Sequence, residues 1–401
     1  MRTTIDFVHK KCYLIAVQLA RLGVIMIQSV LGMMEGSGMA GYILLLALGI
    51  LLVVKGGDWF VDAASWIAEV SGIPTFIIGA TIVSVATTLP EILVSSISAA
   101  EGQAAMAIGN AVGSVNCNIA LIMAFSLVFI APTFNRKDFM AKAIILLATI
   151  SVLWGLSAMG GEFTWWNAVI VLMFFVAFLV ENIISAKKHA NAIALENANA
   201  QPQQPVEHGN GILRYYFQKQ EDRKITLKKT GMVIEKKDIG KNIVLFVVGA
   251  AAIFVGAQLM SDNGAALARV LKVPEGIIGV TILAVGTSLP ELVTAITSIV
   301  KKKADLSVGN IIGANIIDLS LILPLCAFIN MGNGGGSLPV DAQSLTIDFP
   351  FCLAVAGFAV IPALVMGKFK RWQGVILIAG YITYVVLLIL NTTGVIKIFE
   401  T

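Results

Sequence analysis

The amino-acid sequence predicts an all-α polytopic membrane protein with ten transmembrane helices, arranged as two inverted five-helix repeats. Hydrophobic residues make up 57% of the chain and charged residues only 13%, and the mean hydropathy is +0.87, whereas soluble domains carry about 25% charged residues. Apolar stretches close to the roughly 20 residues of a helical span occur ten times. In addition, residues 56–118 are repeated, without a gap, at 256–318.

The ten apolar stretches are the predicted spans. They lie at residues 40–68, 73–99, 105–131, 141–160, 163–185, 241–268, 275–300, 304–331, 345–366 and 373–395. Residues 1–38 precede them and have three interpretations. They form an extra N-terminal helix, a signal-like segment, or a stretch upstream of the true start, since Met39 opens a clean first helix. Arg21, near the middle of the apolar part of this extension, argues against the extra helix.

Lysine and arginine predict the orientation in the membrane. Eleven of the 28 such residues lie at positions 185 to 241, with Lys241 included, and positively charged short loops remain cytoplasmic. The linker 186–240 is therefore placed in the cytoplasm, between a first repeat at 39–185 and a second at 241–401. Three other basic loops share its side, at 133–142, 301–303 and 367–371, and the loops 100–103 and 332–344, which lack lysine and arginine, lie outside.

The linker itself has two parts of different composition. Residues 190–211 are rich in alanine, asparagine and glutamine, which predicts disorder. Residues 212–241 are basic and contain three aromatic residues; they either lie on anionic lipid headgroups or form a solvated tether. Neither part is long enough to predict a folded regulatory domain.

The internal repeat predicts that the two halves enter the membrane in opposite directions. About a third of the positions in 56–118 are identical in 256–318. Five spans, an odd number, separate equivalent points, so the second copy is inverted. The charges agree, because Glu101-Gly102-Gln103 aligns with Lys301-Lys302-Lys303 and only one of these loops is then cytoplasmic. Inverted repeats of this kind are typical of secondary transporters.

A proline and a glutamate recur in both repeats, in VATTLPEI at 85–92 and VGTSLPEL at 285–292. Proline lacks the N–H that bonds the preceding turn, so carbonyls between Ser84 and Thr87, and between Ala284 and Thr287, are predicted to be free. Helical offsets of three, four and seven place four side chains on one face. These are Ser84, Thr87, Thr88 and Glu91, repeated as Ala284, Thr287, Ser288 and Glu291. The alternative is a proline kink in which the hydroxyls hydrogen-bond to the backbone of their own helix, but it does not explain the duplication.

The next span of each half carries a second duplicated motif, GNAVGSVNCN at 109–118 and GNIIGANIID at 309–318. Its glycines have the spacing of close helix packing. Its polar residues need another role, because polar side chains at membrane depth mark a site or a pathway. They are Asn110, Ser114 and Asn118 in the first copy, and Asn310 and Asp318, with Ala314 between them, in the second.

Together these residues predict an anionic site built from oxygen atoms. Three carboxylates (Glu91, Glu291 and Asp318) and the amide of Asn118 join the hydroxyls and free carbonyls, with no histidine or lysine in the motifs. Ca²⁺ prefers six to eight such ligands, whereas Mg²⁺ keeps its waters and soft metals prefer sulfur or nitrogen. Four other acidic residues are predicted to line a vestibule or to pack helices: Asp58, Asp62, Asp262 and Glu181.

The two motif pairs resemble the alpha-repeats of the calcium/cation antiporter superfamily, and the prokaryotic sodium/calcium exchanger branch most of all. The resemblance covers about residues 39–395. It implies ten helices in two inverted halves, with the first helix of each half sliding or rocking against a bundle that holds the ions.

The resemblance also implies a ligand set. It places Ca²⁺ on Glu91 and Glu291 with the backbone oxygens of Thr87 and Thr287. It places Na⁺ on Ser84, Thr88, Ser114 and Glu91 in one half, on Ala284, Ser288 and Glu291 in the other, and puts Asn118 and Asp318 at the centre. The sequence departs from the family pattern at Ala86, at Val115 and at Ala314. Only Ala314 removes a hydroxyl, from one Na⁺ position.

The function that the resemblance implies is secondary active exchange of Na⁺ for Ca²⁺ across the cell membrane by alternating access, normally with Na⁺ entry driving Ca²⁺ export. The chain is then a transporter and not an enzyme, with no cofactor, no nucleic-acid partner, and a monomer as the working unit. The alternative in the same superfamily is a Ca²⁺/H⁺ exchanger. A Ca²⁺ channel and an intramembrane enzyme are further alternatives, but neither explains a duplicated coordination shell inside one chain.

Overall fold

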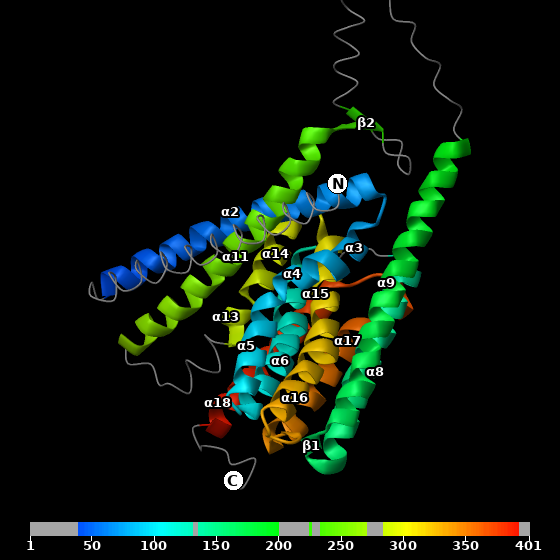
Figure 1. Cartoon of the computed structure of the whole chain (residues 1–401). Coiled ribbons are helices and arrows are strands. Elements are labelled where there is room, and N and C mark those ends of the chain that lie inside the picture. Colours follow the sequence, from blue (N-terminus) through cyan, green and yellow to red (C-terminus); the bar gives the residue numbers. More distant parts are fainter. Residues whose placement is uncertain (1–38, 131–134, 200–223, 227–232, 271–283, 393–401) are drawn as a thin grey trace, which may run out of the picture.

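The computed structural model describes residues 39–130, 135–199, 224–226, 233–270 and 284–392, and it consists mainly of long helices (Figure 1). The interpretations of residues 1–38 therefore lie outside the described residues, as does most of the basic part of the linker. The all-α prediction holds apart from two short antiparallel strand pairs, in which β1 (Glu162–Phe163) pairs with β4 (Leu338–Pro339) and β2 (Lys224–Thr226) with β3 (Val233–Glu235).

The described helices divide between the two halves of the chain. In the first half they are α2 (Met39–Ser71), α3 (Thr75–Ile78), the π-helix η1 (Gly79–Val83), α4 (Ser84–Thr87), α5 (Leu89–Ala100), α6 (Ala104–Cys117), the π-helix η2 (Asn118–Met123), α7 (Ala124–Phe129), α8 (Arg136–Gly160) and α9 (Trp165–Asn199). In the second half they are α11 (Lys236–Val270), α13 (Ala284–Thr287), α14 (Leu289–Val300), α15 (Ala304–Ile317), the π-helix η4 (Asp318–Ile322), α16 (Leu323–Gly332), the π-helix η5 (Ser344–Asp348), α17 (Phe349–Met366) and α18 (Arg371–Thr392).

Eight helices in the described part of the chain are long and apolar enough to cross a membrane. A ninth span is formed by residues 75–87 and 89–100 if this pair, bent by 45°, is counted as one. Of the further span predicted at 275–300, the structure describes only the part from residue 284. This part contains α14, a shorter apolar helix. The chain is thus a polytopic helical membrane protein.

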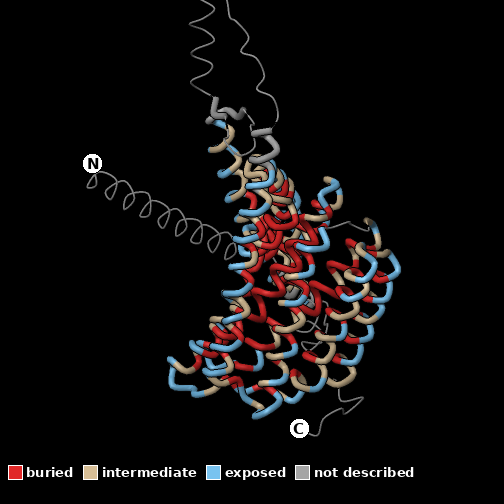
Figure 2. Tube along the Cα trace, turned by 90° about the vertical axis from the view of Figure 1, so that its right-hand side faces the viewer, coloured by how far each residue is buried: buried red, intermediate tan, exposed pale blue. Residues whose placement is uncertain are grey.

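Two long spans are the most deeply buried of the bundle, whose interior is coloured as buried in Figure 2. In the most apolar part of the span Ala304–Gly332, 83% of the residues are buried, and in that of Ala104–Phe129, 72% are buried. In that of α2 only 28% are buried. These central spans carry the second duplicated motif. Of the polar residues of that motif, Ser114, Asn118, Asn310 and Asp318 are therefore buried in the interior, and Asn110 is half-buried.

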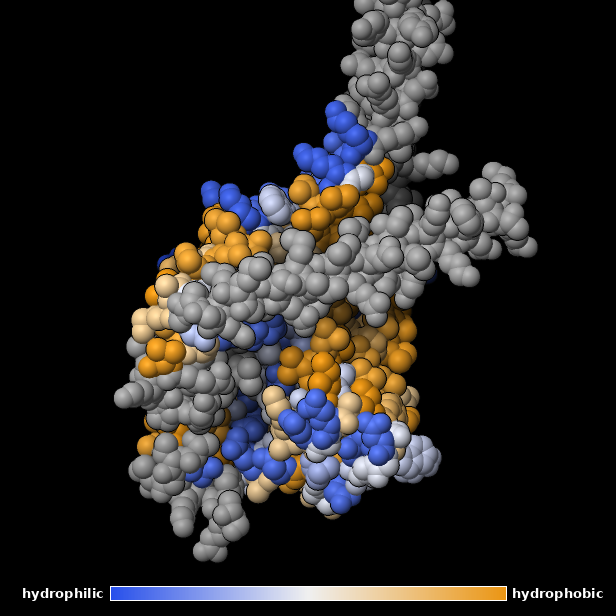
Figure 3. Space-filling view, turned by 60° about the vertical axis from the view of Figure 1, so that its left-hand side comes forward, coloured by the Kyte–Doolittle hydropathy of each residue, from blue (hydrophilic) through white to orange (hydrophobic). Residues whose placement is uncertain are grey.

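Helices α2 and α11 cross one side of the bundle together (Figure 1). Their backbones touch at glycines, since a Cβ on Gly49 would lie 2.9 Å from the Gly256 carbonyl oxygen and one on Gly56 would lie 2.9 Å from that of Gly249. The pairing runs in opposite directions along the two helices, so they are antiparallel. Figure 3 shows hydrophobic side chains over the middle of this side and hydrophilic ones toward both ends.

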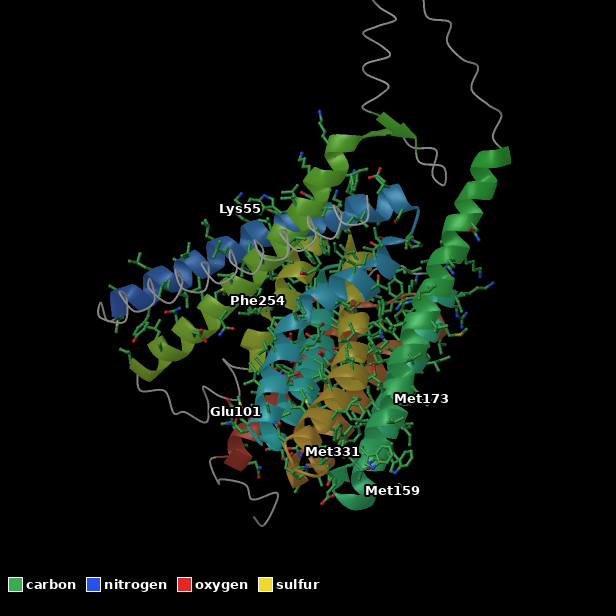
Figure 4. The ribbon with its side chains drawn as sticks, in the orientation of Figure 1. Lys55, Glu101, Met159, Met173, Phe254 and Met331 are labelled. Carbon is green, nitrogen blue, oxygen red and sulfur yellow. The ribbon has the colours of Figure 1, made fainter. Side chains whose placement is uncertain are left out.

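The turns of the chain gather at two opposite ends. At one end the Asn333 side chain donates to the Ala100 carbonyl over 3.0 Å, and Glu101, Met159 and Met331 all lie toward this end (Figure 4). At the other end Arg371 donates to the Phe129 carbonyl over 3.5 Å. The loops 100–103 and 332–344 therefore share one end, as the charge pattern predicts.

The prediction of disorder at 190–211 is wrong for its first ten residues, because α9 continues without a break to Asn199. The segment ANAIALENAN contains good helix formers, and extending a helix that the membrane span has already nucleated costs little. Composition alone does not reveal this continuity.

Candidate cation site

The first duplicated motif folds as a bent helix whose break is at Thr88. The Pro-Glu pair opens α5, where a proline in the first turn loses no helical hydrogen bond, and Thr88 lies between α4 and α5. The Ser84 carbonyl is not free as predicted, because the Thr88 N–H donates to it over 2.9 Å. The bend of 45° nevertheless brings Glu91 into the centre of the bundle, where it is buried.

The second copy of the motif has the same local structure. Ser288 separates α13 from α14, Pro290 lies in the first turn of α14, and Glu291 is fully buried. Ala284 opens α13, but its side chain lies outside the described residues. The proline and glutamate thus set the same break and the same buried carboxylate in both halves.

The second duplicated motif ends in a π-helical turn in each half. Asn118 begins η2 and Asp318 begins η4. A π-helical turn shifts the hydrogen-bond register and often marks a functional site. In α15, Gly309 and Gly313 allow close approach, since a Cβ on Gly313 would lie 2.6 Å from the Ser84 hydroxyl oxygen. This confirms the predicted packing role of the glycines for the second copy.

Hydrogen bonds join the two motifs across the halves in a reciprocal pattern. Thr87 donates to the Asn310 amide oxygen over 3.1 Å, and Thr287 donates to the Asn110 amide oxygen over 3.4 Å. Thr88 donates to one carboxylate oxygen of Glu291 over 3.4 Å. Each bent helix is therefore held against the central helix of the other half.

Many polar atoms at this junction are buried without a hydrogen-bond partner from another described side chain. They belong to Glu91, Ser114, Asn118, Ser288, Glu291, Asn310 and Asp318. Buried polar atoms are nearly always paired, so a cluster of unpaired ones needs an explanation. Most of these atoms are oxygens, which suits a cation.

The carboxylates are also close enough to repel one another. Glu91 interacts electrostatically with Glu291 and Asp318, and within the described residues the ion pairs of lysine and histidine go to other acids. No group of three or more histidine, cysteine, aspartate or glutamate side chains among the described residues is placed to hold one metal ion. A cation here therefore needs hydroxyl, amide or backbone oxygens as well as carboxylates.

The ligand set implied by the resemblance leaves out two polar residues of the second motif, Asn110 and Asn310. Both hold a threonine of the opposite half, and Asn110 also donates to Ser95 over 2.9 Å. Their identical position in the two motifs was the available signal. Cys117 is buried and contacts Ser288, so it lies against the site, although a lone thiol fits hard cations poorly.

The other acidic residues lie away from this cluster. Glu181 pairs with the buried Lys142 over 2.5 Å, and Asp62 pairs with Lys301 over 2.7 Å. Asp262 accepts from Gln258 in its own helix, and the Asp58 backbone carbonyl also accepts from Lys301. Their packing or vestibule roles stay predictions.

Comparison with known families matches residues 41–184 and 241–390 to the model of the sodium/calcium exchanger proteins. The chain belongs to the sodium/calcium exchanger family. The match omits residues 185–240, the segment between the two halves. Membership makes the protein a cation/Ca²⁺ antiporter and confirms the resemblance seen in the motifs.

Relatives of this exchanger span nearly its whole length. The inner membrane protein YrbG of Escherichia coli is 30% identical over 86% of this chain and 95% of its own, and the sodium/calcium exchanger MaX1 of Methanosarcina acetivorans is 29% identical over 86% and 97%. The structure of the sodium-calcium exchanger NCX_Mj aligns with a TM-score of 0.65 at 24% identity, over 87% of this chain and 99% of that one. The likeness to NCX_Mj establishes a shared fold.

Proposed function

We propose that this exchanger moves Ca²⁺ and Na⁺ in opposite directions, with Na⁺ entry normally driving Ca²⁺ export. The observation that carries the proposal is the pair of buried glutamates, Glu91 and Glu291, one from each half, in a cluster of unpaired oxygens. An occupied, neutralised site crosses the low-dielectric barrier more readily than an empty anionic one. Competition of the two cations for one glutamate pair then produces exchange.

The proposed Ca²⁺ site uses both glutamates with the backbone oxygens of Thr87 and Thr287. The Na⁺ sites use Ser84, Thr88 and Ser114 in one half, Ala284 and Ser288 in the other, each half with its glutamate, and Asn118 and Asp318 at the centre. The burial of Glu91, Glu291 and Asp318 and the reciprocal Thr–Asn hydrogen bonds support this set. Ala314, where the first half has Ser114, leaves one Na⁺ position short of a hydroxyl.

The proposed architecture is ten spans in the cell membrane, in two inverted repeats, 39–185 and 241–401. The linker 186–240, in the cytoplasm, joins the repeats, and the monomer is the working unit. Two findings support inversion. The glycine contacts of α2 and α11 are reciprocal, Gly49 with Gly256 and Gly56 with Gly249, and these glycines occupy equivalent positions 200 residues apart. The Thr–Asn hydrogen bonds are reciprocal in the same way.

The test is ⁴⁵Ca²⁺ uptake into proteoliposomes loaded with Na⁺. We expect uptake driven by internal Na⁺ and its loss in Glu91→Gln and Glu291→Gln, with Glu69→Gln, an exposed glutamate, as the matched control. Wild-type uptake in either glutamine variant contradicts the assigned site. Uptake driven only by a pH gradient instead identifies a proton-coupled exchanger.

A further inference from the structure

Helices α2 and α14 make a tight seam at Gly57. A Cβ placed on Gly57 would lie 2.8 Å from the Thr297 hydroxyl oxygen and 2.8 Å from a methyl group of Val293. Both neighbours are β-branched and stiff at χ1, so they cannot turn aside easily. Only glycine allows α2 to lie this close to α14.

The equivalent place in the other half is open. The repeat relates Gly57, Val293 and Thr297 to Ala257, Leu93 and Ile97. These three line a cavity of about 420 Å³ between α5, α6 and α11, together with Met106 and Phe254. One seam is therefore closed and its counterpart is a cavity, although the same repeat builds both.

The cavity reaches from the cation site toward the end of the bundle that carries the loop 100–103. Pro90 and Thr287, which neighbour the buried glutamates, line it at one end, and Ile97 lies one turn before the loop. The closed seam lies along α14 on the way to the opposite loop, 301–303. With the linker placed in the cytoplasm, the cavity lies on the outer side of the buried glutamates and the closed seam lies on their inner side.

An ion pair holds the sealed side. The Lys301 ammonium lies 2.7 Å from a carboxylate oxygen of Asp62 and donates to the Asp58 carbonyl over 2.8 Å. The repeat relates Lys301 to Glu101 and Asp62 to Asp262. Here Glu101 accepts from Gln103 and Asp262 accepts from Gln258, so the two acids each have a local partner.

We propose that Gly57 and Lys301 are the inner-gate residues of this exchanger, and that their replacement by Ala257 and Glu101 in the other half makes the outward-open state the resting state. The proposal rests on the proposed alternating access and orientation. Closing the outer side in the same way would place the methyl group of Ala257 in the seam. It would also bring the carboxylates of Glu101 and Asp262 near each other, and like charges repel. Closing the inner side meets neither obstacle.

The experiment measures how fast an impermeant maleimide, added outside, labels Ile97→Cys in the cavity. The reporter chain carries Cys12→Ser, and the other cysteines, Cys117, Cys326 and Cys352, are buried. We expect Lys301→Gln to slow labelling by up to about fivefold, the effect of one exposed ion pair. Lys302→Gln, an exposed neighbour with the same change of charge, should have no effect.

Two further variants separate a gate from a structural role. Exchanging the charges, with Lys301→Asp and Asp62→Lys together, should restore fast labelling. Glu101→Lys, at an exposed turn, should slow labelling because the new lysine pairs with Asp262 when the outer side closes. If Lys301→Gln and Glu101→Lys are both labelled as fast as Lys302→Gln, the proposal of an inner gate is wrong. That result leaves the proposed function standing, because Na⁺-driven uptake in the unaltered chain tests it separately.

Discussion

Thr87 donates a hydrogen bond to the amide oxygen of Asn310 over 3.1 Å, although 223 residues separate the two in the chain. The bond fixes the turn that precedes Glu91 against the central helix of the other half. Because the backbone oxygen of Thr87 is a proposed Ca²⁺ ligand, the bond also sets where that oxygen points.

The first prediction concerns this bond. Asn310→Ala should lower Na⁺-driven Ca²⁺ uptake by about two- to tenfold, the value of one buried hydrogen bond, because Thr87 loses its acceptor. Asn310→Asp keeps an acceptor oxygen at that position and should retain more activity than the alanine variant. Uptake rates at saturating Ca²⁺, per folded protein, give the comparison. Equal rates in both variants would show that Thr87 needs no partner there.

The second prediction concerns the missing hydroxyl at Ala314, which is fully buried. Ala314→Ser restores the residue type that the first half has at Ser114, and should raise the apparent Na⁺ affinity by about two- to tenfold if the hydroxyl gains a ligand role. Ser114→Ala should lower it. The measurement is the Na⁺ concentration that gives half-maximal Ca²⁺ uptake. An unchanged value in both variants removes these positions from the Na⁺ sites.

The third prediction concerns the glycine contacts of α2 and α11. A Cβ on Gly256 would lie 2.8 Å from the Gly49 carbonyl oxygen and 2.9 Å from the Val53 backbone nitrogen. Gly256→Ala should therefore destabilise the fold by about 1–3 kcal/mol and slow exchange. Gly155→Ala, in α8 with no described atom within 4 Å, is the matched control and should stabilise slightly. Thermal unfolding in detergent reports the difference.

The sequence predicted the parts of the site that repeat and that are costly in a membrane. A proline followed by a glutamate in an apolar run has few structural explanations, and its duplication at Glu91 and Glu291 identified the break and the buried carboxylates together. The order of helices followed from hydropathy for the same reason, since ten apolar runs leave few arrangements.

The sequence did not predict contacts that depend on tertiary packing. Asn110 and Asn310 looked like any polar residue of the motif until the opposite threonines were placed beside them. The continuation of α9 to Asn199 and the difference between the closed Gly57 seam and the open Ala257 cavity are likewise invisible in residue types. They follow from where neighbouring helices lie.

The fourth prediction concerns Lys142, which is fully buried and pairs with Glu181 over 2.5 Å. Glu181→Gln removes the partner and leaves an uncompensated buried ammonium, which should destabilise the protein by about 3–5 kcal/mol. The double variant Lys142→Met with Glu181→Leu removes both charges and should recover most of that loss. Thermal unfolding measures both, with the exposed Glu69→Gln as control. A double variant no more stable than Glu181→Gln would show that the pair stabilises the α8–α9 packing through its own attraction, and not merely by compensating a buried charge.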